Sequence, residues 1–452
     1  MPSRWFRAID VRRGVEIVTA AAVVWAVSGC HDATGPGWQN LHIESGLADT
    51  LYQRSLLLHV SASGVSDVRG IDLVIDPGTP SELHAVGFNP CLAYIYPQDE
   101  ACDWQIAVLD TLANGPHRLV LQLSDATGVV ATREADVVIY VAAVPYTLTP
   151  LPGLGGTNSA ALDVNASGLI AGWAADAAGI QHAVTWQDGA ITVLPTNASA
   201  RSSLAVAVNA AGDVVGGVVD TVGTAYCERG IRWSSGTWRY EGVLGRSVPW
   251  NVPAPSYCSQ RVIAINASGA MLIRAPEAFG YDDETAWLDQ MGAVITFTGV
   301  KPLAMNDLGQ VIGRHTNGLY DFPWAWGVAI PNTPGHHAVH YSPTLIGINA
   351  RSQLLVDSFL ATPGEPLLDL FPFLGGFSGS VQVPDNGTVL AFDWRAYGAI
   401  LWRAGRTMRV ALTPQGWRLD GITRMNDAGM IVGHAKETST GRTSAVVLRP
   451  TP

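Results

Sequence analysis

The chain has few charged residues: they make up 14% of its 452 residues, and lysine occurs only as Lys301 and Lys436. The formal net charge is −11. A chain of negative charge repels phosphate backbones, so we expect no nucleic-acid partner. The scarcity of charge accompanies 48 glycines and 27 prolines. This balance favours many short strands joined by tight turns, and the composition therefore predicts an all-β protein.

Catalytic signatures are also missing from the sequence. It contains no Gly-x-Ser-x-Gly elbow, no His-Glu-x-x-His pair and no phosphate loop, so no cofactor is expected. A long apolar run is missing too. The apolar segment near the start, VEIVTAAAVVWA, is too short to span a bilayer. Because the basic stretch MPSRWFRAIDVRRG precedes it, residues 1–29 are predicted to be a signal peptide.

The signal peptide ends in a distinctive tetrapeptide. Val27-Ser28-Gly29-Cys30 resembles the bacterial lipobox, and this resemblance implies that the Cys30 thiol is acylated and anchors the protein to a membrane. Residues 30–37 then form the lipidated cysteine and a flexible tether. The residue after the cysteine is histidine rather than aspartate, which favours the outer membrane of the cell envelope. A buried cysteine behind an ordinary signal peptide is the alternative.

Cysteine is scarce, with five in the chain. The four that remain after Cys30 are an even number in an exported protein, which predicts two disulfides. Three pairings are possible. The nearest-neighbour pairing keeps each bridge within one domain, so we expect Cys91–Cys102 and Cys227–Cys258.

Residues 38–144 show alternating strand patterns without a repeated phrase. In PHRLVLQLSDATG, the leucines 119, 121 and 123 share one face. About seven short strands in this stretch predict an antiparallel sandwich. GPHRLVLQLSDATG also resembles the penultimate strand of bacterial surface immunoglobulin-like modules, which implies an immunoglobulin-like β-sandwich that serves as a spacer.

Residues 145–452 repeat one phrase. It reads ALDVNASGLIAGW at residue 161 and returns as AVAVNAAGDVVGG, VIAINASGAMLI, PLAMNDLGQVIG and ITRMNDAGMIVG. In each case Asn can bond to the backbone of its own turn, while Gly supplies a positive φ. The predicted turn residues are Asn165 and Gly168, Asn209 and Gly212, Asn266 and Gly269, Asn306 and Gly309, and Asn426 and Gly429, with weaker matches at Asn349 and Pro384.

The repeats predict a ring of sheets. Intervals of 35 to 57 residues between the turns, and four strands per unit, fit a seven-bladed β-propeller. The weak fifth and sixth units leave a ring of six blades as the alternative. The last unit stops after three strands, whereas residues 146–153 before the first unit resemble an isolated fourth strand. We therefore expect this segment to complete the last blade. A tryptophan ends most third strands, and we expect it to pack between blades.

The first unit also resembles a known family of repeats. LPGLGGTNSAALDVNASGLIAGW, followed by HAVTW, is similar to the HAF-type extracellular repeats of bacteria. The matching residues are Leu154, Gly155, Gly156, Asn165, Gly168, Gly172, His182, Ala183 and Trp186. This resemblance implies an exported repeat protein and says nothing about chemistry.

Candidate residues for chemistry are few. The loop with Asp282, Asp283 and Glu284 next to Trp287 is a speculative ligand-binding site, although consecutive acidic residues are more often solvated. His336 and His340 are a weak candidate for a metal site, because the surrounding sequence disfavours the helix that would bring them together. We expect no metal.

The sequence as a whole predicts a lipoprotein of the bacterial cell envelope, anchored in a membrane, which binds an extracellular protein or glycan without catalysis. A propeller hydrolase or lyase that uses residues such as Asp282, Asp283 and His336 is one alternative. A purely structural envelope component is the other.

Overall fold

A computed structural model describes much of the chain after residue 39. In this part the protein is all-β and contains no helix, and so no helix that could cross a membrane. The chain divides into two units: unit 1 holds residues 1–142, 369–376 and 404–407, and unit 2 holds the rest. The described residues are 40–44, 50–51, 56–63, 70–86, 102–108, 112–125, 128–222, 225–241, 261–275, 285–290, 293–298, 300–316, 321–328, 345–356, 359–370, 381–393, 397–414 and 416–451.

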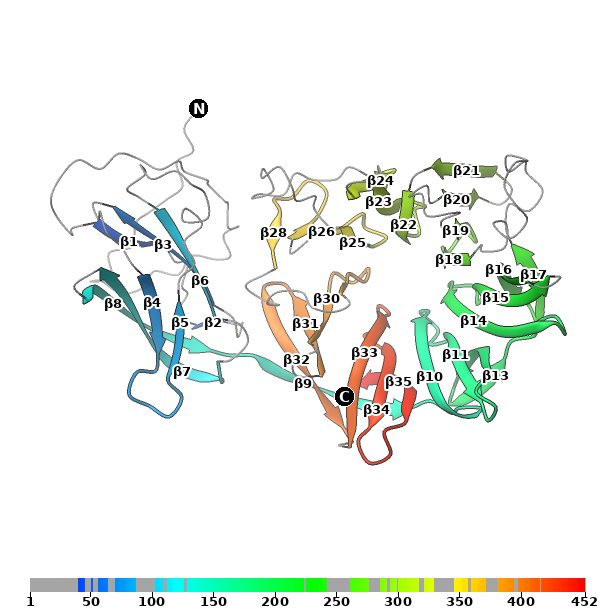
Figure 1. Ribbon diagram of the computed structural model, residues 1–452, viewed down its shortest axis with the longest axis horizontal. Helices are drawn as coiled ribbons and strands as arrows, with labels where there is room; N and C mark the ends of the chain where they lie inside the picture. The colour runs from blue at the N-terminus through cyan, green and yellow to red at the C-terminus, as the bar shows by residue number, and fades with distance from the viewer. Residues whose placement is uncertain are drawn as a thin grey trace. The chain divides into compact units, whose positions relative to one another are not determined.

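Unit 1 contains two sheets (Figure 1, blue to cyan). The five-stranded sheet has the order β2-β8-β7-β4-β5, and the three-stranded sheet has the order β1-β3-β6. The first sheet is formed by β2 (Thr50–Leu51), β8 (Gly128–Ile139), β7 (Gly115–Asp125), β4 (Gly70–Ile75) and β5 (Leu83–Val86). The second is formed by β1 (Asn40–Glu44), β3 (Leu56–Ser63) and β6 (Cys102–Val108).

A buried histidine fixes the start of β7. The Nδ1 atom of His117 lies 2.6 Å from the Asp76 carboxylate, and its Nε2 lies 2.8 Å from the Ala113 carbonyl. Asp76 also accepts a hydrogen bond from the backbone amide of Arg118. On the same face of the strand as His117, Leu119 and Leu121 are buried, as the alternation of the sequence predicts.

Unit 2 contains seven antiparallel meanders in its described part (Figure 1, teal to red). We number them one to seven. Meanders one to three are β10 (Gly155–Val164), β11 (Ile170–Asp176), β12 (Gln181–Gln187) and β13 (Ala190–Val193); β14 (Ala200–Val208), β15 (Val214–Val222), β16 (Ala225–Ser234) and β17 (Thr237–Glu241); and β18 (Arg261–Ile265), β19 (Met271–Ala275), β20 (Thr285–Gln290) and β21 (Ala293–Thr298).

Meanders four to six are β22 (Val300–Met305), β23 (Val311–Thr316) and β24 (Asp321–Trp326); β25 (Leu345–Ile348), β26 (Leu354–Val356), β27 (Phe359–Ala361) and β28 (Leu368–Asp369); and β29 (Val381–Gln382), β30 (Val389–Asp393), β31 (Gly398–Arg403) and β32 (Arg406–Thr413). Meander seven is β33 (Trp417–Met425), β34 (Ile431–Glu437), β35 (Thr443–Pro450) and β9 (Ala142–Pro150). None of the described sheets closes into a barrel.

The strand β9 completes meander seven, as the sequence indicates. It runs antiparallel to β35, with Thr149 opposite Val447 and Tyr146 opposite Pro450. The Tyr146 hydroxyl donates to the Gly429 carbonyl, 283 residues away in the sequence. Strand β9 also borders β32 of meander six, so it joins meanders six and seven within one 12-stranded sheet that also includes meander one.

A bulge shapes the first strand of most meanders. In β10 the register shifts between Ala161 and Asp163, and comparable shifts occur in β14, β18, β22, β25 and β33. The bulge brings a carbonyl against the facing strand. A Cβ atom on Gly172 would lie 2.2 Å from the Ala160 carbonyl oxygen, and one on Gly433 would lie 2.2 Å from that of Gly421. This close approach explains the second glycine of the repeated phrase.

The tryptophans that end the third strands lie in the core. Trp186 and Trp233 are 1% and 4% exposed, and Trp402 is buried as well. The indole N–H of Trp186 donates to the Pro152 carbonyl and that of Trp233 to the Pro195 carbonyl. The expectation of a packing role is confirmed for these three residues. The side chain of Trp287 lies outside the described residues.

Candidate functional site

The residues that the sequence singles out for chemistry lie outside the described part of the chain. So do three of the five cysteines, and for the two others only the position in a strand is described. No disulfide is found in the described part, and the predicted pairing stays a prediction. The undescribed residues are Cys30, Cys91, Cys258, Asp282, Asp283, Glu284, His336 and His340, while Cys102 begins β6 and Cys227 lies in β16.

The repeated turns are described in full, and they form the most regular polar feature of unit 2. In the first turn the Asn165 Oδ1 accepts hydrogen bonds from the amides of Ser167 and Leu169, at 3.1 and 3.0 Å. The Asn165 carbonyl accepts a bond from the amide of Gly168, whose φ is +82°. Since only glycine adopts this φ readily, the Asn-x-x-Gly spacing follows from the turn. The turns at Asn209, Asn266, Asn306 and Asn426 repeat this arrangement.

The amide group of each turn asparagine bridges to the next turn. Asn165 donates from Nδ2 to the Asn209 carbonyl at 2.9 Å, and Asn426 of the last turn donates to the Asn165 carbonyl at 3.0 Å. The bridges therefore form a cycle that begins and ends at the first turn. The other links run from Asn209 to Asn266, from Asn266 to Asp307, from Asn306 to Asn349, from Asn349 to Pro384 and from Asn386 to Asp427.

The fifth and sixth turns keep the geometry with other residues. Ser352 replaces the glycine of the fifth turn and adopts a φ of +58°. In the sixth turn Pro384 occupies the asparagine position, so its side chain can donate no hydrogen bond. Asn386, two residues later, donates to the Asp427 carbonyl at 3.1 Å instead. Sequence reasoning missed Asn386, although the Asn386-Gly387 pair is a turn signal in its own right.

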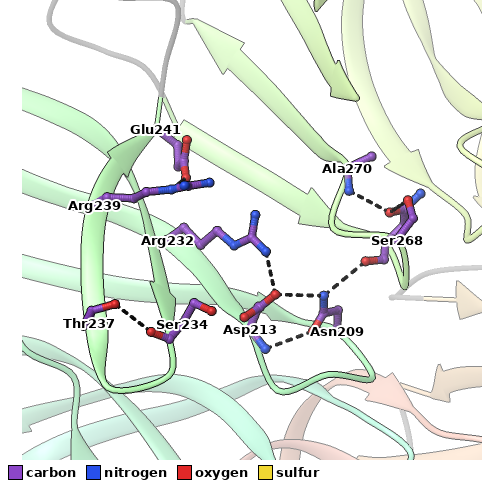
Figure 2. A network of polar contacts seen from close by, with 10 residues as sticks. Asn209, Asp213, Arg232, Ser234, Thr237, Arg239, Glu241, Ser268 and Ala270 are labelled. Atoms are coloured by element: carbon purple, nitrogen blue, oxygen red, sulfur yellow. Dashed lines mark hydrogen bonds and ion pairs between the residues drawn. The ribbon is translucent and has the colours of Figure 1, made fainter. Parts of the chain in front are cut away.

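A charged network surrounds the second turn (Figure 2). The Asp213 carboxylate accepts a hydrogen bond from the Arg232 guanidinium at 2.6 Å and lies 3.4 Å from the Asn209 amide. Burial would raise the pKa of Asp213, but hydrogen bonds from Ser234 and Arg232 outweigh it and lower the pKa. Arg232 also packs against Gly269 of the third turn. The network thus joins meanders two and three.

A second charged pair links three meanders. Asp163 of β10 accepts a hydrogen bond from the Val208 amide of β14 at 2.8 Å, and its other oxygen lies 3.4 Å from Arg424 of β33. The Asp163 side chain is 13% exposed, whereas that of Arg424 is 54% exposed. Burial raises the pKa of Asp163, against the opposing effects of Arg424 and of the backbone amides.

A third polar group lies where meanders six and seven meet. Tyr397, in the turn before β31, is 44% exposed. The Arg418 guanidinium of β33 lies 4.4 Å from the centre of its ring. Arg418 Nε donates to the Asp420 carboxylate at 2.8 Å. Leu401 of β31 and Leu419 of β33 belong to a shared core cluster.

Little in the described part points to catalysis. No group of three or more His, Cys, Asp or Glu side chains is placed to hold a metal ion in the residues that the structure describes. The side-chain oxygen and nitrogen of the turn asparagines form hydrogen bonds with backbone atoms. Asp163 and Asp213 pair with arginines. Such an arrangement holds sheets together. By contrast, the Tyr397–Arg418–Asp420 group presents an aromatic ring and a guanidinium to solvent.

Comparisons with known proteins give no family. Neither a protein-family model nor a curated protein matches the chain. A solved structure of a DUF4784 family protein from Bacteroides caccae is 11% identical, and the alignment covers 82% of this chain and 99% of that one, with a TM-score of 0.21. The structure of a bacterial ice-binding adhesin is 10% identical over 61% of this chain and 92% of that one, with a TM-score of 0.13. Likenesses this weak support no argument about fold or function.

Proposed function

We propose that this protein is an exported lipoprotein of the bacterial cell envelope that binds an extracellular protein or glycan without catalysis. In this proposal an immunoglobulin-like sandwich carries a seven-bladed β-propeller away from the membrane. The observation that carries the propeller, and with it the scaffold role, is the cycle of asparagine bridges, which returns from Asn426 to Asn165.

Three features of unit 2 support the propeller. Its described strands form seven meanders, and the first strand of each one contacts or bonds to that of the next. The last meander takes its fourth strand, β9, from the N-terminal side of the first meander. Such a strand exchange closes a ring and leaves only short edges exposed.

The use of polar groups supports a scaffold rather than an enzyme. The residues of the repeated phrase are occupied by the fold: Ser159 accepts a hydrogen bond from the Ala445 amide, and His182 pairs with Asp176 at 2.9 Å. Because the repeats supply a rigid framework, ligand specificity is determined by loops and exposed groups that differ from one meander to the next. A face where several such loops converge is a typical binding site.

The lipobox resemblance of residues 27–30 supports the anchor, and metabolic labelling tests it. The full chain, expressed in a Gram-negative host with labelled palmitate, should incorporate the label and sediment with membranes. The Cys30→Ser variant should do neither, while Cys102→Ser, a matched control, should keep the label. A labelled Cys30→Ser protein would refute the anchor.

The binding role is tested by asking whether the protein retains a ligand without converting it to product. The detergent-solubilised full chain should retain a component of envelope extracts and release it unchanged in mass. Release of shortened glycan or peptide products would instead identify an enzyme. A chain that retains no component would contradict the scaffold function and leave a structural role.

A further inference from the structure

The group at Tyr397 combines an exposed aromatic ring with a partly exposed guanidinium. The Tyr397 side chain is among the exposed large hydrophobic residues, and the Arg418 side chain is 41% exposed. Only Nε of Arg418 bonds to Asp420. The two terminal nitrogens of a guanidinium held in this way keep donors for a ligand, in a fixed planar fork.

The backbone around the group is irregular at two points. Tyr397 adopts a φ of +48°, which a bulky side chain rarely takes. On β33 the register shifts between Leu419 and Gly421, so Asp420 is an extra residue in the strand. Bulges of this kind redirect side chains and are common beside functional sites. Here Asp420, the extra residue of the bulge, accepts a hydrogen bond from the Arg418 guanidinium.

The surrounding sequence has the opposite charge to the chain as a whole. Residues 394–452 contain eight arginines and Lys436 against three acidic residues, a net charge of +6 in a chain whose net charge is −11. Lys436 lies directly opposite Arg418 in the β33–β34 register, so the two side chains share a face of the sheet. An anionic ligand is therefore favoured at this point and disfavoured over the rest of the protein.

We propose that Tyr397, Arg418 and Lys436 form a binding site for a carboxylated sugar of an extracellular polysaccharide, such as a uronic acid. The free edge of Arg418 binds the sugar carboxylate in a bidentate manner, and Lys436 adds charge. Arg418 covers one face of the Tyr397 ring, and the exposed ring packs against the apolar C–H face of the sugar. Asp420 is a positioning residue, since it holds the Arg418 fork without contacting the ligand.

This inference rests on the proposed binding function and names its ligand class. It is tested with the detergent-solubilised full chain and a short oligogalacturonate, by isothermal titration at low and physiological salt. The methyl-esterified oligomer is the matched ligand, because it keeps the sugar rings and loses the charge. Polyphosphate is the probe for charge alone.

We expect the free acid to bind and the ester to bind at least about tenfold more weakly, a difference of about 1.4 kcal/mol. Arg418→Lys, which keeps the charge and loses the fork, should weaken binding by about tenfold. Tyr397→Ala should weaken it by about fivefold for the oligogalacturonate and leave the affinity for polyphosphate unchanged. Asp420→Asn should have a smaller effect that grows with salt, because a loosened Arg418 then relies on charge alone.

Two matched controls lie in unit 1. Arg118 is an exposed arginine that pairs with Glu134 at 2.7 Å, and Tyr140 is an exposed tyrosine. Arg118→Ala and Tyr140→Ala should leave the affinity unchanged. Circular dichroism and the thermal midpoint check that each variant is folded, which is expected because none of the substituted side chains is buried.

Several outcomes would overturn the inference. Equal affinity for the acid and the ester would show that the carboxylate is not recognised. If the unit 1 variants weaken binding as much as the Tyr397 and Arg418 variants do, these residues do not form the binding site. Polyphosphate could bind as tightly as oligogalacturonate, with an affinity that Tyr397→Ala does not change. This result would mean that the group binds anions by charge alone and does not recognise the sugar. A wild-type chain that binds no oligogalacturonate would also refute the inference. The proposed function would still stand if that chain retained another envelope component.

Discussion

The side-chain amide of Asn426 donates a hydrogen bond to the main-chain carbonyl of Asn165, 261 residues earlier in the sequence. Both residues are 7% exposed. The bond joins the last turn of the chain to the first and completes a cycle in which each turn bridges to the next. Because a buried carbonyl needs a partner, each amide in the cycle satisfies an acceptor that belongs to its neighbour.

Asn165→Asp should destabilise unit 2. The substituted side chain keeps the oxygen that accepts bonds from Ser167 and Leu169, but it replaces the donor to the Asn209 carbonyl with a second acceptor. An unsatisfied buried carbonyl costs about 1–3 kcal/mol, and a buried charge adds to that. The midpoint of urea unfolding should therefore fall.

The control for this substitution is Asn197→Asp. Asn197 begins the same Asn-Ala-Ser tripeptide, but its amide bonds locally to the Ser199 hydroxyl at 2.6 Å and takes no part in the cycle. Replacing the Asn197 amide should change the free energy of unfolding by less than about 0.5 kcal/mol. If the two variants unfold at the same urea concentration, the cycle contributes nothing to stability.

The turns were predictable from the sequence because Asn and Gly have specific roles in them. Asn supplies the local acceptor and Gly the positive φ, and both recur at a readable spacing. The pairing of β9 with β35 was predictable as well. The last repeat unit has only three strands in the sequence, and residues 146–153 resemble a fourth strand that belongs to no other unit. Alternation likewise indicated the buried face of β7.

The bridges between turns were not predictable in the same way. They join residues 35 or more positions apart, and local pattern contains no information about such a contact. Ser352 adopts a positive φ without being glycine, and Asn386 takes over from Pro384 at a different position in its turn. The pair of Tyr397 and Arg418 depends on the packing of two meanders, which only the tertiary structure provides.

Gly172→Ala should also destabilise unit 2, for a steric reason. The added Cβ would lie 2.2 Å from the Ala160 carbonyl oxygen and 3.0 Å from a ring carbon of Trp186. To relieve this steric clash, the bulge or the tryptophan must move, which lowers the free energy of unfolding by about 1–3 kcal/mol. Thermal unfolding followed by circular dichroism measures the loss.

Gly347→Ala is the matched substitution for Gly172→Ala. Gly172 lies in the second strand of its meander, β11, and Gly347 in a first strand, β25, where its Cβ would meet Val383 at an ordinary 3.7 Å. The thermal midpoint of this variant should stay near that of the wild type. A loss as large as that of Gly172→Ala would show that any side chain harms these strands, whatever the space.

Two aspartates of meander one should give stability opposite dependences on pH. The hydrogen bond from His182 lowers the pKa of Asp176 below its unfolded value of about 3.9. Its stabilising contribution is therefore present above about pH 4 and is lost as the pH falls through the folded pKa. Burial raises the pKa of Asp163, so its contribution is present at low pH and is lost as the pH rises through the folded pKa.

Urea midpoints measured from pH 3 to pH 8 separate these two effects. Relative to the wild type, Asp176→Asn should lose stability that the wild type shows only above about pH 4. Asp163→Asn should remove a decline that the wild type shows as the pH rises above about 4. Parallel curves for the wild type and Asp163→Asn would mean that the Asp163 carboxyl titrates alike in the folded and unfolded chains.

The last prediction concerns the exchanged strand. A chain that begins at residue 151 lacks β9 and leaves the edges of both β35 and β32 without their partner. Exposed edges pair with other chains, so this protein should associate or aggregate. A chain that begins at residue 143 keeps nearly all of β9 while losing the N-terminal module, and it should stay monomeric. Light scattering after size-exclusion chromatography compares the two. If both are monomers, β9 is dispensable and the asparagine cycle alone holds the last meander to the first.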